Sequence, residues 1–232
     1  MCPRPARNSK PGDHQLFGFT PPVLAAAGAR PRYDDRVDDV HDRMELAWSE
    51  ARGGIDTHGL VLPGSPAFVC QADLCDAWCC RNLTVALDDA DAARLERETG
   101  RAQRTFLESE RGVPIALPLA QPYVLGRCDG ACVFLAGDRR CGAYSGRPDA
   151  CRLYPHSILF VDAETGRPLA LSAPDRRAAV EGALHGEQSE ALPLLLRHLA
   201  CPGFTGPPLD VPAWRSLLAE TYSLQFRELV MA

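Results

Sequence analysis

The sequence lacks long apolar segments. No stretch approaches the roughly 20 apolar residues that a membrane-spanning helix needs, so we expect no membrane partner. Residues 1–10 also lack the apolar stretch and small-residue cleavage site of a secretory signal. We therefore expect a cytoplasmic protein, in which thiols stay reduced and cysteine patterns indicate metal binding or catalysis more often than disulfides.

The sequence also lacks blocks of lysine or arginine. Its formal net charge is −5, so no overall basic field would attract a phosphate backbone, and we expect no nucleic-acid partner. No glycine-rich fingerprint follows a strand, no radical-type run of three closely spaced cysteines is present, and no Ser, His and Asp set indicates acyl transfer. The sequence leaves open whether the protein is an enzyme.

What is present is typical of a globular domain with extensions. The chain has 232 residues, of which 46% are hydrophobic and 24% charged, the usual balance of a soluble protein. Residues 1–33 carry scattered Pro, Gly and Arg without a sustained period, which predicts an irregular or disordered arm. Residues 34–232 are expected to form a single cysteine-cluster metal-binding domain.

The hydrophobic pattern predicts helices and short strands. An apolar stripe indicates a helix over 34–52, and Asp88 can cap a second helix that ends near Gly100 after a strand at 83–87. Residues 157–161 and 168–171 resemble a hairpin. Further helices are expected over 174–184, over 189–199 and from Pro212 onward. The expected fold is a small, irregular α+β domain built around a cysteine-ligated metal centre, with flanking helices and a β-hairpin.

Eight cysteines form two dense groups in the middle of the chain. The first group is Cys70, Cys75, Cys79 and Cys80, and the second is Cys128, Cys132, Cys141 and Cys151. Thiolates are soft anionic ligands, and four of them can hold Zn²⁺ or the irons of a [2Fe-2S] or [4Fe-4S] cluster. The two groups together therefore predict a joint site for an iron-sulfur centre, zinc or iron ions.

The spacing of these cysteines does not identify the metal. It matches neither the paired two-residue gaps of a zinc ribbon nor the bacterial ferredoxin run, and it only approaches the plant-type ferredoxin pattern. Adjacent Cys79 and Cys80 cannot easily both point at one tetrahedral ion, so they serve two centres or one of them is a buried thiol. A disulfide framework and wholly unligated thiols are the disfavoured alternatives.

With both groups in view, residues 68–205 resemble the YkgJ-like, or CxxCxxCC, family of zinc- or iron-chelating proteins. The resemblance rests on the segments 75–80, 132–135, 141–144 and 147–155, and on Cys201-Pro202-Gly203. It implies a metal site at the matching cysteines. The wider spacing of Cys70, Cys75 and Cys79 is similar to that of flagellin lysine N-methylases.

Several residues near the cysteines are candidates for supporting roles. Arg147 and Arg152 flank Cys151 and could offset thiolate charge through hydrogen bonds to sulfur, or could be solvated surface side chains. Cys201 is either a ninth ligand or a buried thiol, because Pro202-Gly203 forms a turn that would free amides to bond its sulfur. His156 is expected to be a packing or surface residue beside a strand rather than to bind zinc or donate to a sulfur.

Three functions fit these observations. The first is a metal-centred protein whose cluster is structural or redox-active. The second is an S-adenosylmethionine-dependent methylase acting on lysine in a protein or peptide substrate, which the family resemblance implies. The third is an interaction module in which zinc substitutes for a hydrophobic core.

Overall fold

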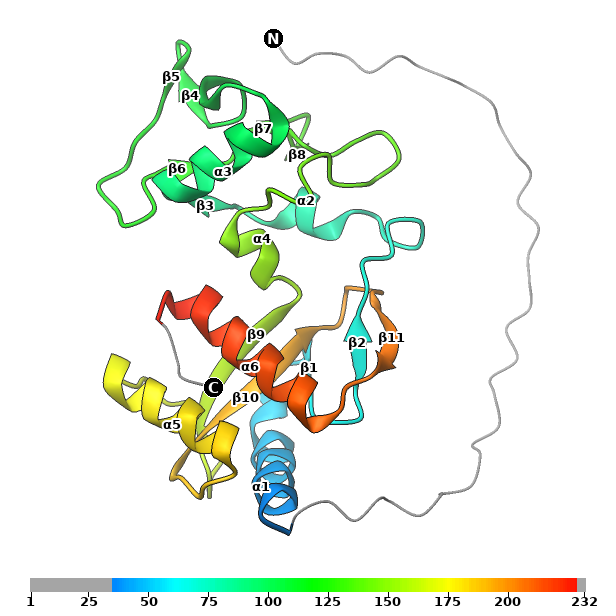
Figure 1. Cartoon of the computed structure of the whole chain (residues 1–232), viewed down its shortest axis with the longest axis vertical. Coiled ribbons are helices and arrows are strands. Elements are labelled where there is room, and N and C mark those ends of the chain that lie inside the picture. Colours follow the sequence, from blue (N-terminus) through cyan, green and yellow to red (C-terminus); the bar gives the residue numbers. More distant parts are fainter. Residues whose placement is uncertain (1–34, 229–232) are drawn as a thin grey trace, which may run out of the picture.

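The largest sheet of the computed structural model, which describes residues 35–228, has three antiparallel strands. Their order is β1 (His58–Leu60), β10 (Ala191–His198) and β9 (His156–Asp162), so β10 is paired on both sides. Helices α1 (Asp35–Ala51), α5 (Ala173–His185) and α6 (Val211–Phe226) pack against these strands (Figure 1). The arm expected at 1–33 lies outside the described residues.

The sheet and its helices enclose the first of two hydrophobic clusters. Trp214 of α6 is fully buried, and its Nε1 donates a hydrogen bond to the carbonyl of Val61 at 2.8 Å. On α1, the predicted apolar stripe faces this cluster, with Val40 and Met44 buried. Burial of a large side chain contributes about 1.5–3 kcal/mol, so this cluster is the main source of stability for this half of the chain.

The second hydrophobic cluster lies under α3 (Asp89–Thr99) and is built from much shorter elements. As predicted, α3 is capped by the side chain of Asp88, which accepts a hydrogen bond from the Asp91 amide, and ends at Gly100 in a left-handed conformation. The strands here pair as β3 (Ala86–Leu87) with β6 (Tyr123–Val124), β4 (Ser109–Glu110) with β5 (Val113–Pro114), and β7 (Arg127–Cys128) with β8 (Ala131–Cys132).

The remaining elements connect the two clusters. They are the short helices α2 (Trp78–Asn82) and α4 (Asp149–Leu153), the strand pair β2 (Pro66–Phe68) and β11 (Phe204–Pro208), and the 3-10 turns Arg52–Gly54 and Gln103–Thr105. Figure 1 shows α4 between the upper elements, α3 and β3–β8, and the lower sheet with α6. In residues 35–228, no helix combines the length and apolarity needed to cross a bilayer. The predicted α+β class is confirmed.

Two expected elements differ from the structure. The helix predicted over 189–199 is wrong, because residues 191–198 form strand β10. This strand lies in the middle of the sheet and reads as a continuous apolar run, which periodicity cannot distinguish from a buried helix. The second arm of the expected hairpin, 168–171, makes only an isolated bridge between Pro168 and Val161, while β9 takes β10 as its full partner.

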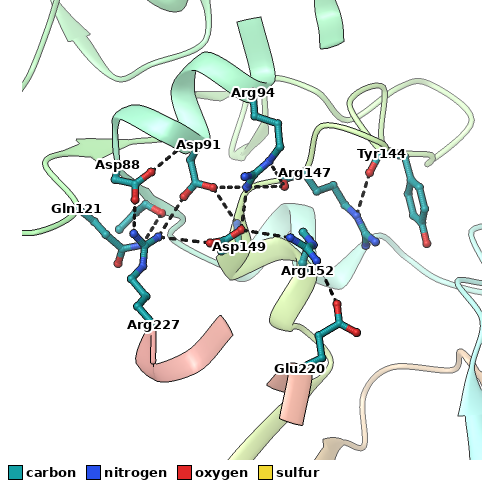
Figure 2. Close-up of polar contacts among 11 residues, drawn as sticks. Asp88, Asp91, Arg94, Gln121, Tyr144, Arg147, Asp149, Arg152, Glu220 and Arg227 are labelled. Atoms are coloured by element: carbon teal, nitrogen blue, oxygen red, sulfur yellow. Dashed lines mark hydrogen bonds and ion pairs between the residues drawn. The ribbon is translucent and has the colours of Figure 1, made fainter. Parts of the chain in front are cut away.

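An ion-pair network fixes α4 between the two clusters (Figure 2). Arg94 of α3 donates to Asp149 at 2.8 Å, and the backbone amide of Asp149 donates to the buried Asp91 carboxylate at 3.1 Å. Arg227, which follows α6, pairs with Asp88 and with Asp91. Two parts of the chain, α3 with its cap and the segment that follows α6, therefore hold the amino-terminal end of the helix that carries Cys151.

An aromatic contact ties α2 to the sheet. Trp78 stacks on Tyr154 with ring centroids 5.5 Å apart, and it lies 4.4 Å from the ring of His198 at the end of β10. Offset aromatic pairs of this kind add about 0.5–1.5 kcal/mol beyond their buried area. The contact positions the neighbouring Cys79 and Cys80 relative to the ends of α4 and β10.

Candidate metal centre

Eight cysteines from five segments of the chain line one pocket of about 90 Å³. None of the eight forms a disulfide. They are Cys70, Cys75, Cys79, Cys80, Cys132, Cys141, Cys151 and Cys201. The structure thus brings together most of the cysteines that the sequence singled out, although up to 131 positions separate them in the chain.

The first group reaches the pocket through a tight loop and a one-turn helix. The amide of Cys75 donates to the carbonyl of Gln71 at 3.0 Å, which closes the loop after Cys70. Ala77 then adopts a left-handed conformation, with φ at 62°, and starts α2. This conformation is uncommon for a residue with a Cβ, and it turns α2 so that Cys79 and Cys80 both reach the pocket.

Three cysteines of the second group, Cys132, Cys141 and Cys151, reach the pocket through a hairpin, a loop and a helix. Asp129 and Gly130 both have positive φ, as the turn between paired strands β7 and β8 requires. Cys132 follows this turn, and its sulfur accepts a hydrogen bond from the Phe134 amide at 3.4 Å. Cys141 bridges back to Leu135 as an isolated strand pair.

Cys201 joins the pocket from the end of β10. The amide of Val69 donates to the carbonyl of Gly203 at 2.7 Å, which places the Cys201 turn beside Cys70. A Cβ at Gly203 would lie 2.5 Å from the Phe68 ring, so this close approach requires glycine. The Gly203 amide also donates to the Cys201 sulfur, in agreement with the amide-to-sulfur bonding expected for this turn.

Cys128 is the one predicted ligand that the structure does not place in the pocket wall. It lies on β7 and contacts the side chain of Asp129, with its sulfur 3.9 Å from Oδ2. Its hairpin partner strand carries Cys132, which does line the pocket. The hairpin therefore separates two cysteines that the sequence spacing had grouped together.

Where the two groups of cysteines meet, the thiols shift one another's pKa values. The Cys80 thiol forms hydrogen bonds with Cys79 and Cys132, and these bonds raise the pKa of Cys80. The same bonds lower the pKa values of Cys79 and Cys132, because their thiolates accept from Cys80. Burial raises the pKa of Cys151 to about 12. Cys79 and Cys132 are therefore the thiols that ionise most readily.

These pKa shifts predict the order of alkylation in metal-free protein. At about pH 7, Cys79 and Cys132 should react with iodoacetamide first, because the thiolate is the nucleophile. Cys80 and Cys151 should react last, because their raised pKa values keep them protonated until much higher pH. Peptide mass spectrometry over time gives the order. Cys70 is the control, since it is exposed but has a raised pKa; if it reacts first, exposure rather than ionisation governs the reaction.

Three arginines line the pocket. Arg147 lies over the Tyr144 ring, 3.9 Å from its centroid, and its positive charge lowers the pKa values of thiols in both groups. Arg139 donates to the carbonyls of Cys75 and Asp73, both at 3.2 Å. Arg127 completes the set. Sequence reasoning missed Arg127 and Arg139, although each is within two residues of a group cysteine.

Arg152 lies elsewhere, and so does His156. Arg152 donates to Glu220 at 3.1 Å and pairs with Asp149, outside the thiol pocket (Figure 2). His156 packs edge-on against Phe68 and Phe204, and burial lowers its pKa to about 4. It does not line the thiol pocket. This packing agrees with the sequence expectation for His156.

The donor set fits a thiophilic metal. No His, Asp or Glu from the described residues lines the pocket. Besides the thiols, its polar lining side chains are those of Gln71, Tyr144, Tyr154 and three arginines, so the thiol sulfurs are the main candidate ligand atoms. Within residues 35–228, no group of three or more His, Cys, Asp or Glu side chains is already arranged to hold an ion. Metal binding would therefore need the thiols to move from the positions that they hold in this structure.

Comparison with known proteins identifies the domain that contains these cysteines. Residues 69–176 match the model of the CxxCxxCC family, described as "putative zinc- or iron-chelating domain". Searches of curated proteins and of solved structures each gave no significant match. The similarity to flagellin lysine N-methylases is not shown by these comparisons. The matched segment, residues 69–176, holds all the pocket cysteines except Cys201, so the resemblance to the CxxCxxCC family is confirmed over this segment.

Proposed function

We propose that the thiol pocket holds iron as an iron-sulfur centre and that the protein's role is structural or redox-active, without a reaction of its own. The observation that carries this proposal is the set of thiol donors described above, with eight thiols around one small pocket. Iron-sulfur clusters are held by cysteine thiolates, and their potentials respond to hydrogen bonds to sulfur and to nearby charge. The amides of Phe134 and Gly203 and the guanidinium of Arg147 would supply these influences.

Structural zinc is the second candidate, and the size of the local core favours it. The cluster beneath the pocket contains only eight buried residues, and its strands are two residues long. Cys132, Cys141 and Cys151 pack directly against this cluster. Small domains with such cores often depend on a metal for stability, because the free energy of binding becomes free energy of folding.

Anaerobic purification of the full chain, with an absorption spectrum and metal and sulfide analysis, separates the two candidates. An iron-sulfur centre predicts iron, acid-labile sulfide and a broad absorption band from sulfur-to-iron charge transfer. Colourless protein with stoichiometric zinc and no sulfide would contradict the iron-sulfur proposal and support the structural one. For a methylase, the corresponding test is calorimetric titration of metal-loaded protein with S-adenosylmethionine; no feature of the described residues favours that function.

A further inference from the structure

We propose that the pocket thiols form two separate metal centres of four cysteines each, an inference that rests on the proposed metal binding. The first thiol set is Cys70, Cys75, Cys79 and Cys201, and the second thiol set is Cys80, Cys132, Cys141 and Cys151. Four thiolates satisfy one tetrahedral Zn²⁺ or Fe²⁺ ion, or the irons of one cluster. This division differs from the order along the chain, because it separates the neighbours Cys79 and Cys80.

The first thiol set is assembled on the β2 and β11 side of the pocket. The Val69–Gly203 backbone bond places Cys70 beside the Cys201 turn, and Gln71 donates from its side chain to Thr205 of β11 at 3.0 Å. These contacts anchor the 70–75 loop to the segment that follows Cys201. The cysteines whose charge raises the pKa of Cys201 are Cys75, Cys79 and Cys70, which agrees with this placement.

The second thiol set is assembled on the second hydrophobic cluster. Cys132, Cys141 and Cys151 all pack against that cluster, whereas Cys70, Cys75 and Cys201 do not. Helix α2 contacts strand β8, and there Cys80 forms its hydrogen bond with Cys132. The neighbouring cysteines whose charge raises the pKa of Cys151 are Cys132, Cys141 and Cys79. Cys201 is not among the main causes of this shift. Two physically distinct supports thus carry the two sets.

The assignment of Cys79 and Cys80 follows from helix geometry. Consecutive residues of an α-helix point about 100° apart around its axis, so adjacent cysteines on α2 face different directions. Cys80 is bonded to Cys132, which assigns it to the second set. Cys79 points away from Cys80 around the helix and completes the first set of four, although its charge acts on cysteines of both sets. The Cys79–Cys80 contact is where the two centres would meet.

Two metal centres so close together would concentrate negative charge, and the arginines lie where that charge would build up. The positive charge of Arg147 lowers the pKa values of Cys70 in the first set and of Cys141 and Cys151 in the second set. Arg139 comes from the loop that carries Cys141 and bonds the carbonyl of Cys75. These guanidiniums connect the two sets without occupying a ligand position.

Metal stoichiometry tests the division. We would titrate reduced, metal-free full-length protein with Co²⁺, whose thiolate charge-transfer and d–d bands report tetrahedral sulfur ligation. The wild-type protein is expected to bind two ions per chain, and Cys201→Ser and Cys141→Ser are each expected to bind one with full affinity. The Cys201→Ser/Cys141→Ser double variant should bind none tightly. Cys128→Ser is the matched control and should bind two.

The outcomes are distinct. If either single variant loses both ions while circular dichroism shows it folded, or if the wild-type protein saturates at one ion, the two-centre proposal is wrong. If Cys141→Ser is unfolded, Cys132→Ser and Cys80→Ser replace it as tests of the second set, and Cys75→Ser tests the first set independently. If the wild-type protein binds no Co²⁺ and contains no metal as purified, the proposed function itself is wrong.

Discussion

Replacing Asp91 with alanine is expected to lower the free energy of unfolding by about 3 kcal/mol, because it removes a buried carboxylate whose partners remain in place. Only 1% of Asp91 is exposed, and its carboxylate accepts from Arg94, from Arg227 and from the Asp149 amide. Without it, two guanidiniums and the start of α4 lose an acceptor. Because α4 carries Cys151, metal binding should weaken as well. Chemical denaturation of the metal-free protein measures the stability change.

The Asp91→Asn variant distinguishes the acceptor from the charge. Burial raises the pKa of Asp91 despite the neighbouring guanidiniums, so ionisation is costly at this position. Asparagine keeps an oxygen for the Asp149 amide and should therefore be less destabilising than alanine. Asp89→Ala on the same helix is the matched control, because Asp89 is exposed and bonds only Tyr123, at 3.1 Å. Equal losses for Asp91→Ala and Asp89→Ala would contradict the role assigned to the network.

Replacing Arg147 with glutamine is expected to weaken metal binding by about 10- to 100-fold, the usual effect of removing a group that supports metal ligands from outside. The charge of Arg147 lowers the pKa values of Cys79, Cys141 and Cys151. Its loss should raise these pKa values, so more protons must leave when metal binds. Competition with a chromophoric chelator measures the affinity, and the loss should be larger at pH 6.5 than at pH 8.5.

Arg152→Gln is the matched control for Arg147→Gln, since both arginines flank Cys151. Arg152 is substantially exposed and pairs with the exposed Glu220 at 3.1 Å and, more loosely, with Asp149 at 3.6 Å, and exposed pairs contribute about 0–1 kcal/mol. Its replacement should leave metal affinity unchanged. An equal loss of affinity in the two variants would mean that Arg152 also acts on the thiols, as the sequence alone had suggested.

The helices could be predicted from the sequence where capping and terminating residues set their ends. The Asp88 cap and Gly100 termination of α3 follow from side-chain capping and from the left-handed conformation that glycine adopts readily. Strand β10 was not predictable from periodicity, because its residues 192–196 are all buried. Pro193 was the available signal, since proline in the interior of a helix removes a hydrogen bond and clashes with the preceding turn.

The candidate site was predictable in composition but not in arrangement. Dense cysteines and the family resemblance singled out nine cysteines, of which all but Cys128 line the pocket; for the distant Cys201, ligand and buried thiol had both remained open. The division into two sets depends on the Val69–Gly203 bond and on packing against the second cluster, which sequence spacing does not encode. For the same reason, the exclusion of Cys128 from the pocket wall needed the β7–β8 hairpin.

Thiol protection by bound metal tests the central claim most directly. The anaerobically purified full chain would be alkylated before and after metal removal by a chelator, and each cysteine would be followed by mass spectrometry. We predict that the eight pocket cysteines are protected until metal is removed, with metal present in stoichiometric amount. Alkylation of these cysteines at the same rate before and after chelator treatment, in protein that contains no metal, would contradict a metal site in this pocket.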